Sequence, residues 1–412
     1  MDKNLLIKFS GNARFMFNEE EVIICNRLNG LWIKISKECY EILKVGENSK
    51  FTVEKLLFAL EDDADRKYIE ELISTLDSMG VFFEKAVCRK IKEISFAITN
   101  RCNLKCSHCI VDASYGKQLD KYDTKTICKF LDKIIKVNPQ SIVLTGGEPL
   151  IRSDFLIILK HVRDNYHGNI TLMTNGTLLN ETNINKIIRL VTNIDISIDG
   201  ADEESCSIVR GAGVFHKVIN NIRLLKKNGF DKISISMVLT ENNSFYVDEF
   251  FKLNRLLGTN PMLRALSYSG RALKNKEILE KKYTLRENYY ESKRSIEYRA
   301  CTCTAGYDQL TIEANGDIFP CNLFVNNEFK IGNIEEIEDI NKLFNIRKGE
   351  VLCSCVQKFE PERFERCKDC NINYFCWSCL YSMYDIKDNF EERCKYKKEL
   401  YANIWENDKK RG

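Results

Sequence analysis

The feature that most limits the fold of this chain is an alternation of strand-like and helix-like segments between residues 91 and 270. Amphipathic stretches, the clearest at 124–137, separate apolar runs of strand length. Strands that alternate with helices of about 10–15 residues predict a parallel α/β sheet with right-handed crossovers. The pattern by itself permits either an open doubly wound sheet or a barrel. The predicted strands are ISFAIT (94–99), SIVLT (141–145), NITLMTN (169–175), NIDISID (193–199) and KISISMVLT (232–240).

An unusual motif follows each of the first four predicted strands. Functional residues gather at the carboxyl ends of the strands in parallel α/β folds. We therefore expect the four motifs to line one mouth of the sheet. In chain order they are Cys102-x3-Cys106-x2-Cys109, then Gly146-Gly147-Glu148-Pro149, then Thr174-Asn175-Gly176, and finally Ser197-Ile198-Asp199-Gly200 with Arg210 soon after.

Cysteine usage indicates metal or redox chemistry. The chain has 18 cysteines but four histidines, so any metal site must be largely thiolate, which favours zinc or iron–sulfur clusters. No charged-then-apolar leader and no apolar run near 18 residues is present, so we expect a soluble, cytoplasmic protein. A net charge of +3, from 62 basic and 59 acidic residues, predicts neither a nucleic acid nor a membrane partner. The length of 412 residues suggests two or three domains.

The motifs at the strand ends, taken together, resemble those of the radical S-adenosylmethionine (SAM) enzymes. The resemblance implies a partial (β/α)6 TIM-type barrel and a [4Fe–4S] cluster held by Cys102, Cys106 and Cys109. The fourth iron would be left open for the methionyl amine and carboxylate of SAM. SAM would be cleaved to methionine and a 5′-deoxyadenosyl radical, with an electron from an external donor such as flavodoxin or ferredoxin. Part of a zinc site is the alternative for the three cysteines.

The same resemblance implies which residues bind SAM. The segment at 146–149 would hold the methionyl amine, with Glu148 as an acceptor and the glycines allowing close approach of the backbone. The positions of Ser197 and Arg210 match family positions near the methionyl carboxylate, which suits the two-pronged donor of an arginine. The remaining candidates are Gly146, Gly147 and Pro149 in the amine segment, Thr174, Asn175 and Asp199 for the ribose hydroxyls, and His108 against the adenine.

Ten of the 18 cysteines lie between Cys301 and Cys394. Their spacing resembles that of a SPASM domain, the auxiliary-cluster extension of radical SAM peptide modifiers, although the last pair is two residues apart here and usually three in the family. A zinc ribbon is the alternative, and Cys353 and Cys355 match no family position. The resemblance implies two auxiliary [4Fe–4S] clusters, which with the SAM cluster make three. One would be bound by Cys367, Cys370, Cys376 and Cys394. The other would be bound by Cys303, Cys321 and Cys379, and whether Cys301 is its fourth ligand is left open.

The first 88 residues read as a small α+β module. Short strands in RFMFNEEEVIICNRLNGLWIKIS precede helical stretches near 37–45, 52–61 and 66–79, an order that predicts a winged-helix-like unit. A DNA-binding unit should show a basic face, but residues 1–90 hold 14 basic and 16 acidic side chains. The module resembles instead the precursor-recognition domain of enzymes that modify ribosomally made peptides, which binds a leader peptide as an added strand. A structural cap on the barrel is the other interpretation.

These resemblances together imply a three-part α/β enzyme. Its parts are a leader-recognition module (1–88), a radical SAM barrel (91–272) and a SPASM domain (300–400), with a charged helical linker at 273–299 between the last two. The expected substrate is a ribosomal precursor peptide, and the expected reaction is an intramolecular cross-link, foremost a thioether from a cysteine sulfur to carbon. Carbon–carbon cross-linking, maturation of sulfatases to formylglycine, and a non-enzymatic iron–sulfur carrier or regulator are the alternatives.

Overall fold

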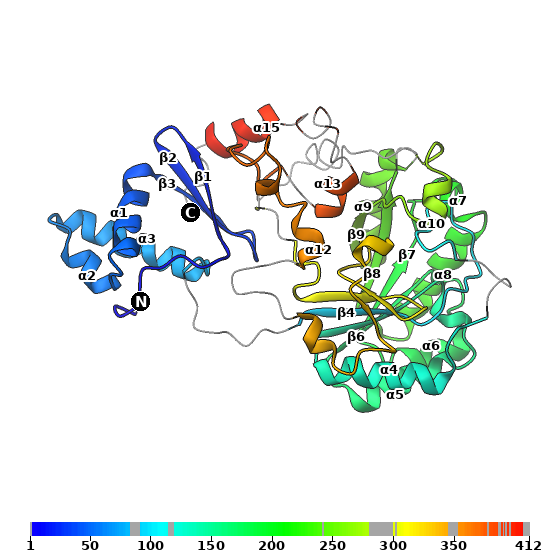
Figure 1. The fold of residues 1–412 in the computed structure, drawn as a ribbon. Coiled ribbons are helices and arrows are strands. Elements are labelled where there is room, and N and C mark those ends of the chain that lie inside the picture. Colours follow the sequence, from blue (N-terminus) through cyan, green and yellow to red (C-terminus); the bar gives the residue numbers. More distant parts are fainter. Residues whose placement is uncertain are drawn as a thin grey trace. The chain divides into compact units, whose positions relative to one another are not determined.

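The structure is a computed structural model. It describes residues 2–82, 91–113, 119–240, 243–279, 300, 303–344, 353–376, 379–385, 389, 391, 394 and 397–406. Contacts divide the chain into two compact units (Figure 1). One contains 1–89, 296–307 and 345–412, and the other contains 90–295 and 308–344. The predicted domain boundaries stay predictions, and most of the predicted linker at 273–299 lies outside the described residues.

The second unit is built on a nine-stranded sheet. Six strands, β4 to β9, lie side by side in chain order and run parallel. A doubly wound sheet would reverse this order at a switch point, whereas consecutive order without reversal is that of a barrel. The sheet order places β4 and β9 apart, so this barrel is partial. The six strands are β4 (Glu93–Ala97), β5 (Ser141–Thr145), β6 (Asn169–Thr174), β7 (Asn193–Ser197), β8 (Ile233–Leu239) and β9 (Asn260–Ala265).

The predicted α/β class is confirmed, and the five predicted strands are present with ends shifted by two residues or fewer. The sequence analysis missed β9. It also missed that three short strands of the cysteine-rich region join the same sheet: β10 (Gln309–Ile312), β11 (Asp317–Phe319) and β12 (Gly332–Asn333). Strand β10 pairs parallel with β4, and an antiparallel hairpin then leads to β11 and β12. This hairpin therefore extends the sheet beside the strand that precedes the first cysteine motif.

Helices cover the outer face of this sheet because alternate strand residues are apolar. In β4, Ile94 and Phe96 pack into the helix-covered core, whereas Ser95 and Ala97 do not. Helix α4 occupies the predicted range and begins at Asp123, whose carboxylate accepts from the Thr126 amide at 2.8 Å. It lies beside α5 along one face of the sheet (Figure 1). The helices are α4 (Thr124–Val137), α5 (Phe155–Asn165), α6 (Glu181–Ile187), α7 (Glu203–Arg210), α8 (Val214–Lys227), α9 (Val247–Leu257) and α10 (Gly270–Lys274), with short helices η1 (Pro149–Ile151), η2 (Ser244–Tyr246), η3 (Asn327–Phe329) and η4 (Ile340–Phe344).

The first unit begins with a three-stranded antiparallel sheet in the order β1-β2-β3, so β3 lies at an edge. The three predicted helices follow and pack on one face of this sheet. Each begins at a short polar residue whose side chain accepts a backbone N–H: Ser36, Thr52 and Asp62. The elements are β1 (Ala13–Asn18), β2 (Glu21–Asn26), β3 (Trp32–Ser36), α1 (Lys37–Asn48), α2 (Val53–Phe58) and α3 (Asp63–Ser78).

The other face of the three-stranded sheet is covered by the C-terminal part of the chain. Trp32 packs edge-on against Phe375, with ring centroids 5.1 Å apart, and the Lys34 ammonium donates to the Trp405 carbonyl at 2.8 Å. Side chains thus pack against both faces of the small sheet. The residues that cover this face lie in 370–376 and 400–405. The helices of the C-terminal part are α12 (Ser354–Gln357), η5 (Pro361–Arg363), α13 (Leu380–Asp385), α15 (Lys397–Tyr401) and η6 (Ala402–Glu406). None of the helices in the described ranges is long and apolar enough to cross a membrane.

Candidate SAM and iron–sulfur site

The loop after β4 carries the three cysteines of the first motif, and each sulfur accepts an N–H. The Cys102 sulfur accepts from the Leu104 amide at 3.4 Å and from the Asn175 side chain at 3.7 Å. The Cys106 sulfur accepts from Arg210 at 3.8 Å, and the Cys109 sulfur accepts from the Ala113 amide at 3.3 Å. N–H donors stabilise charge on a thiolate and tune cluster potentials, so this environment fits a thiolate-bound cluster.

Burial has the opposite effect on the bare thiols. It raises the pKa of Cys102 to about 11 and also raises the pKa of Cys106. A bound cation would offset this effect, because a metal ion deprotonates the thiols that it binds. Among the residues that the structure describes, no three His, Cys, Asp or Glu side chains are gathered closely enough to hold a metal ion. The assignment of the three cysteines as cluster ligands therefore rests on their spacing and their donors.

The two glycines after β5 make room for the cysteine loop. A Cβ atom on Gly146 would lie 2.3 Å from the Thr99 carbonyl oxygen, and one on Gly147 would lie 2.3 Å from the Arg101 carbonyl oxygen. The amides of Gly147 and Glu148 donate to these two carbonyls at 2.8 Å. Gly146 also has a φ of +147°, which side-chain-bearing residues rarely adopt. In this structure the two glycines thus allow the segment after β5 to lie close to the backbone of the cysteine loop.

Glu148 is fully buried and braces two strand ends. Its carboxylate accepts from the Leu150 amide at 3.0 Å, the Thr174 hydroxyl at 2.8 Å and the Asn175 amide at 2.7 Å. Burial raises the pKa of Glu148 despite these bonds. Since a carboxylate offers about four lone-pair sites, one acceptor position is left for a further donor. Pro149 starts the short helix η1 directly after this glutamate.

Three predicted SAM-site residues form one buried network. The Asp199 carboxylate contacts His108 Nε2 at 2.5 Å and Arg210 Nη2 at 2.6 Å, and it accepts from the Val238 amide at 2.6 Å. Burial would raise the pKa of Asp199, but the Arg210 charge and the His108 contact outweigh burial and hold the pKa well below its ordinary value. Burial would lower the pKa of Arg210, but the charge of Asp199 outweighs burial and raises the pKa, so both groups are charged. Asp199 adopts the left-handed φ of 57° that this turn requires.

The remaining predicted residues lie at the same strand ends. Ser197 accepts from the Ser236 hydroxyl at 3.3 Å on the neighbouring strand. Asn175 donates to Asn103 at 2.9 Å, and its carbonyl oxygen accepts from the Thr177 amide at 2.9 Å. The ends of β4, β5, β6 and β7 are therefore linked by side-chain bonds, as the placement of the motifs at one mouth predicts.

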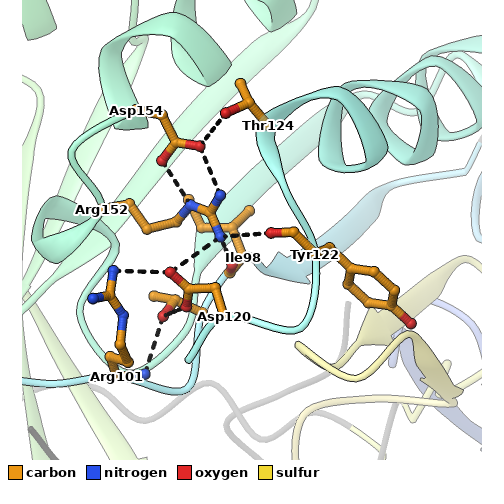
Figure 2. A network of polar contacts seen from close by, with 8 residues as sticks. Ile98, Arg101, Asp120, Tyr122, Thr124, Arg152 and Asp154 are labelled. Carbon is orange, nitrogen blue, oxygen red and sulfur yellow. Dashed lines mark hydrogen bonds and ion pairs between the residues drawn. The ribbon is translucent and has the colours of Figure 1, made fainter. Parts of the chain in front are cut away.

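The sequence analysis missed the charged network that supports the first two motifs (Figure 2). Arg152 contacts Asp154 at 2.7 Å and Asp120 at 3.4 Å, and Asp120 also pairs with Arg101 at 2.8 Å. Arg152 further donates to the carbonyls of Ile98 and Tyr122. The network thus ties the start of the cysteine loop to the segment after Gly-Gly-Glu-Pro. Burial would raise the pKa of Asp154, but the bond from Arg152 and its charge outweigh burial and lower the pKa.

The sequence analysis also missed Arg271, which follows strand β9 and contacts the cysteine loop. It donates to the carbonyls of Cys106 at 3.0 Å and Ala113 at 2.5 Å, and it pairs with Asp112 at 2.9 Å. The preceding Gly270 lies so close to the loop that a Cβ there would sit 2.4 Å from the Ile110 carbonyl oxygen. The Ser-Gly-Arg segment at the end of an apolar run was the signal available in the sequence.

The predicted cluster ligands of the third region fall in both compact units, and one of them lies outside the described residues. Cys367, Cys370 and Cys376 lie in successive turns, with the Cys370 amide donating to the Cys367 carbonyl at 3.0 Å, and Cys394 is exposed. Cys303 and Cys379 are half-buried in the same unit. Cys321 lies in the other unit, and Cys301 lies outside the described residues.

Two family models match parts of this chain. Residues 96–253 match the radical SAM superfamily, and residues 301–371 match the SPASM family, described as an iron–sulfur cluster-binding domain. The chain therefore contains a radical SAM domain followed by a SPASM domain, and it is an enzyme that uses SAM. These two domains imply bound iron–sulfur clusters.

Two relatives illustrate the similarity in sequence. The mycofactocin maturase MftC of Mycolicibacterium smegmatis is 26% identical over 58% of this chain and 67% of that protein. The subtilosin biosynthesis protein AlbA of Bacillus subtilis is 26% identical over 69% of this chain and 66% of that protein. The chain thus aligns with about two thirds of the length of each.

Two solved structures share the fold. Streptococcus suis SuiB bound to the precursor peptide SuiA superposes with a TM-score of 0.55 at 15% identity, covering 92% of this chain and 96% of that one. The enzyme anSMEcpe with bound AdoMet gives a TM-score of 0.53 at 20% identity, covering 75% of this chain and 95% of that one.

Proposed function

We propose that this enzyme is a peptide maturase that installs an intramolecular thioether, from a cysteine sulfur to carbon, in a ribosomally made precursor. The observation that carries the proposal is the edge strand β3 in the small N-terminal sheet. Among the described residues, β3 pairs with β2 alone. An edge strand with free backbone groups can receive an extended peptide as an additional strand.

The register of β3 shows which of its backbone groups face away from β2. The Asn26 amide donates to the Leu31 carbonyl and the Lys37 amide donates to the Glu20 carbonyl, so hydrogen-bonded pairs alternate along this ladder. By that alternation, Ile33 and Ile35 bond to β2, whereas the amide of Lys34 points away from it. This outward amide would pair with the leader peptide.

Side chains behind β3 would supply the floor of the peptide site. Ile33 and Ile35 belong to the same apolar core as four residues of helix α3, namely Ile69, Leu72, Ile73 and Leu76. Backbone pairing would give affinity and the pockets between side chains would give selectivity. A leader peptide held here would bring its core peptide to the enzyme without sequence-specific contacts at the reacting atoms.

The chemistry would come from clusters and SAM. We assign Cys102, Cys106 and Cys109 to the SAM cluster, and the two auxiliary [4Fe–4S] clusters to the sets given by the SPASM resemblance, for three in all. With SAM bound, the first cluster would supply a 5′-deoxyadenosyl radical. Arg210 has one buried donor, Nε, without a partner among the described residues, and we assign it to the methionyl carboxylate.

The chain's own residues would fix the site and exclude water. The Asp199 carboxylate holds Arg210 in place and keeps it charged, while Arg271 holds the cysteine loop through the Cys106 carbonyl. Formation of the thioether removes one hydrogen atom from carbon, one proton from the thiol and one electron. An auxiliary cluster in the SPASM domain is the acceptor that we propose for that electron.

Other activities are less well supported. Sulfatase maturation needs the radical SAM and SPASM parts but leaves the N-terminal module without a role. MftC is a mycofactocin maturase, AlbA is a biosynthesis protein of the bacteriocin subtilosin, and SuiB has been solved with a precursor peptide bound, which together favour a peptide substrate. A carbon–carbon cross-link remains the nearest competing product.

Co-expression with a precursor peptide tests the proposal. A small cysteine-containing open reading frame beside the gene would supply the peptide, and high-resolution mass spectrometry would read the product. We expect the loss of two hydrogens, and fragmentation that places the bond between a cysteine and another residue. The matched control is a variant with Cys102, Cys106 and Cys109 replaced by Ala. A two-hydrogen loss in which every cysteine still reacts with iodoacetamide would show a carbon–carbon bond, and an unmodified peptide would contradict the proposal.

A further inference from the structure

Cys353 and Cys355 are the cysteines of the third region that the SPASM pattern leaves unassigned. They flank Ser354 at the start of α12. The Cys353 carbonyl accepts from the amides of Val356 and Gln357 at 3.0 and 3.1 Å, and the Cys353 amide donates to the Ala305 carbonyl at 3.4 Å. The backbone of the pair is therefore held on both sides.

The two sulfurs lie 3.0 Å apart, and both cysteines are half-buried. A disulfide has an S–S length of about 2.05 Å, so a movement of about 1 Å would bring the sulfurs to bonding distance. The pair is thus preorganised for a disulfide within one short segment.

The protonation of the pair favours reaction at one sulfur. The hydrogen bond with Cys355 lowers the pKa of Cys353 to about 6, whereas the same bond raises the pKa of Cys355. At neutral pH one thiolate is therefore held beside one thiol. A low-pKa, partly accessible cysteine beside a second thiol is the arrangement of redox-active pairs.

We propose that Cys353 and Cys355 form a dithiol–disulfide site that exchanges with low-molecular-weight disulfides and is separate from the cluster ligands. The Cys353 thiolate would attack one sulfur of the external disulfide and release one thiolate. Cys355 would then lose its proton and attack the Cys353 sulfur, releasing the second thiolate. Two protein thiols are oxidised, one external disulfide is reduced to two thiols, and the two electrons balance. The proposal does not depend on the peptide substrate.

Peptide mapping after exposure to oxidised glutathione tests this site. The anaerobically reconstituted enzyme would be incubated with the disulfide, quenched with acid, alkylated and digested with trypsin, which releases both cysteines in residues 349–358. We expect an intramolecular disulfide that forms about tenfold faster than any adduct at the half-buried Cys128 of α4. Cys355→Ser should trap a glutathione adduct on Cys353, and Cys353→Ser should react about tenfold more slowly.

Iron analysis distinguishes the remaining interpretations. If the pair is not a cluster ligand, Cys353→Ser and Cys355→Ser should keep the iron content of the unaltered enzyme, as should the control Cys128→Ser. A loss of about four irons per chain in either variant would overturn the proposal in favour of cluster ligation. Alkylation of both cysteines in the unaltered enzyme, at the rate of Cys128 and with no disulfide, would overturn it in favour of inert thiols.

Discussion

At the scale of single residues, the sequence predicted motifs that depend on local spacing but not contacts between residues far apart in the chain. The cysteine and glycine motifs could be predicted because each lies within a few residues of a strand end. Arg152 and Arg271 could not, since their partners are set by folding: Arg271 bonds to Cys106, 165 positions away. Nor could the sequence predict that Asp199 and Glu148 would be engaged by the protein itself.

Gly146 gives the sharpest residue-scale test of the cysteine loop. Gly146→Ala would place a methyl group 2.3 Å from the Thr99 carbonyl oxygen, which must displace the backbone before Cys102. We expect loss of about four irons per chain and of SAM cleavage. Gly229→Ala is the control, because Gly229 also has a positive φ, +77°, but a Cβ there meets nothing within 4 Å. That control should lose about 1 kcal/mol of stability and no iron. Equal iron in both variants would show that the loop tolerates displacement.

The raised pKa of Glu313 should make the free energy of unfolding depend on pH. Burial, and then the charge of Asp317, raises the pKa of this half-buried carboxyl from 4.5 to about 7. The folded state therefore binds the proton more tightly than the unfolded state, and this contribution to stability falls as pH rises from about 4.5 to 7. We expect Glu313→Gln to be more stable than the unaltered protein by on the order of 2 kcal/mol at pH 8, with little difference at pH 4.5. Thermal unfolding at both pH values measures this, and equal shifts would refute it.

At the scale of elements, periodicity was sufficient for strands with apolar alternation. β5 and α4 have their predicted ends. Strand β9 (NPMLRA) was missed because Pro261 and Arg264 interrupt the pattern and its first three residues are exposed. The short strands β10 to β12 were missed because pairing of β10 with β4, more than 200 positions earlier, leaves no local signal.

Strand β3 can be tested without disturbing its pairing with β2. Lys34→Pro would remove an outward amide donor, whereas its ladder bonds to β2 come from neighbouring residues. The Lys34 side chain also contacts the Trp405 carbonyl and Glu21, so Lys34→Ala is the control that loses these contacts but keeps the amide. We expect Lys34→Pro to weaken binding of the full precursor about tenfold relative to Lys34→Ala, measured by fluorescence anisotropy. Equal affinities would place the leader elsewhere.

At the scale of the whole molecule, chain order is a poor guide to the compact units. The cysteine-rich region divides: its first hairpin extends the large sheet, and its last part covers the N-terminal sheet. Deletion of residues 1–88 would therefore expose apolar side chains such as Phe375 and Trp405, and a point substitution in β3 is the cleaner experiment. The sequence therefore predicted most of the individual segments but not which distant segments pack together in each compact unit.

Anaerobic cleavage of SAM tests the central claim most directly, namely that the three cysteines after β4 form the SAM site. The reconstituted enzyme and a variant with Cys102, Cys106 and Cys109 replaced by Ala would be reduced and given SAM, and 5′-deoxyadenosine would be quantified by chromatography. We predict that the unaltered enzyme forms 5′-deoxyadenosine, and that the variant forms none while keeping the iron of the SPASM domain. Formation of 5′-deoxyadenosine by the variant at the unaltered rate would contradict the account.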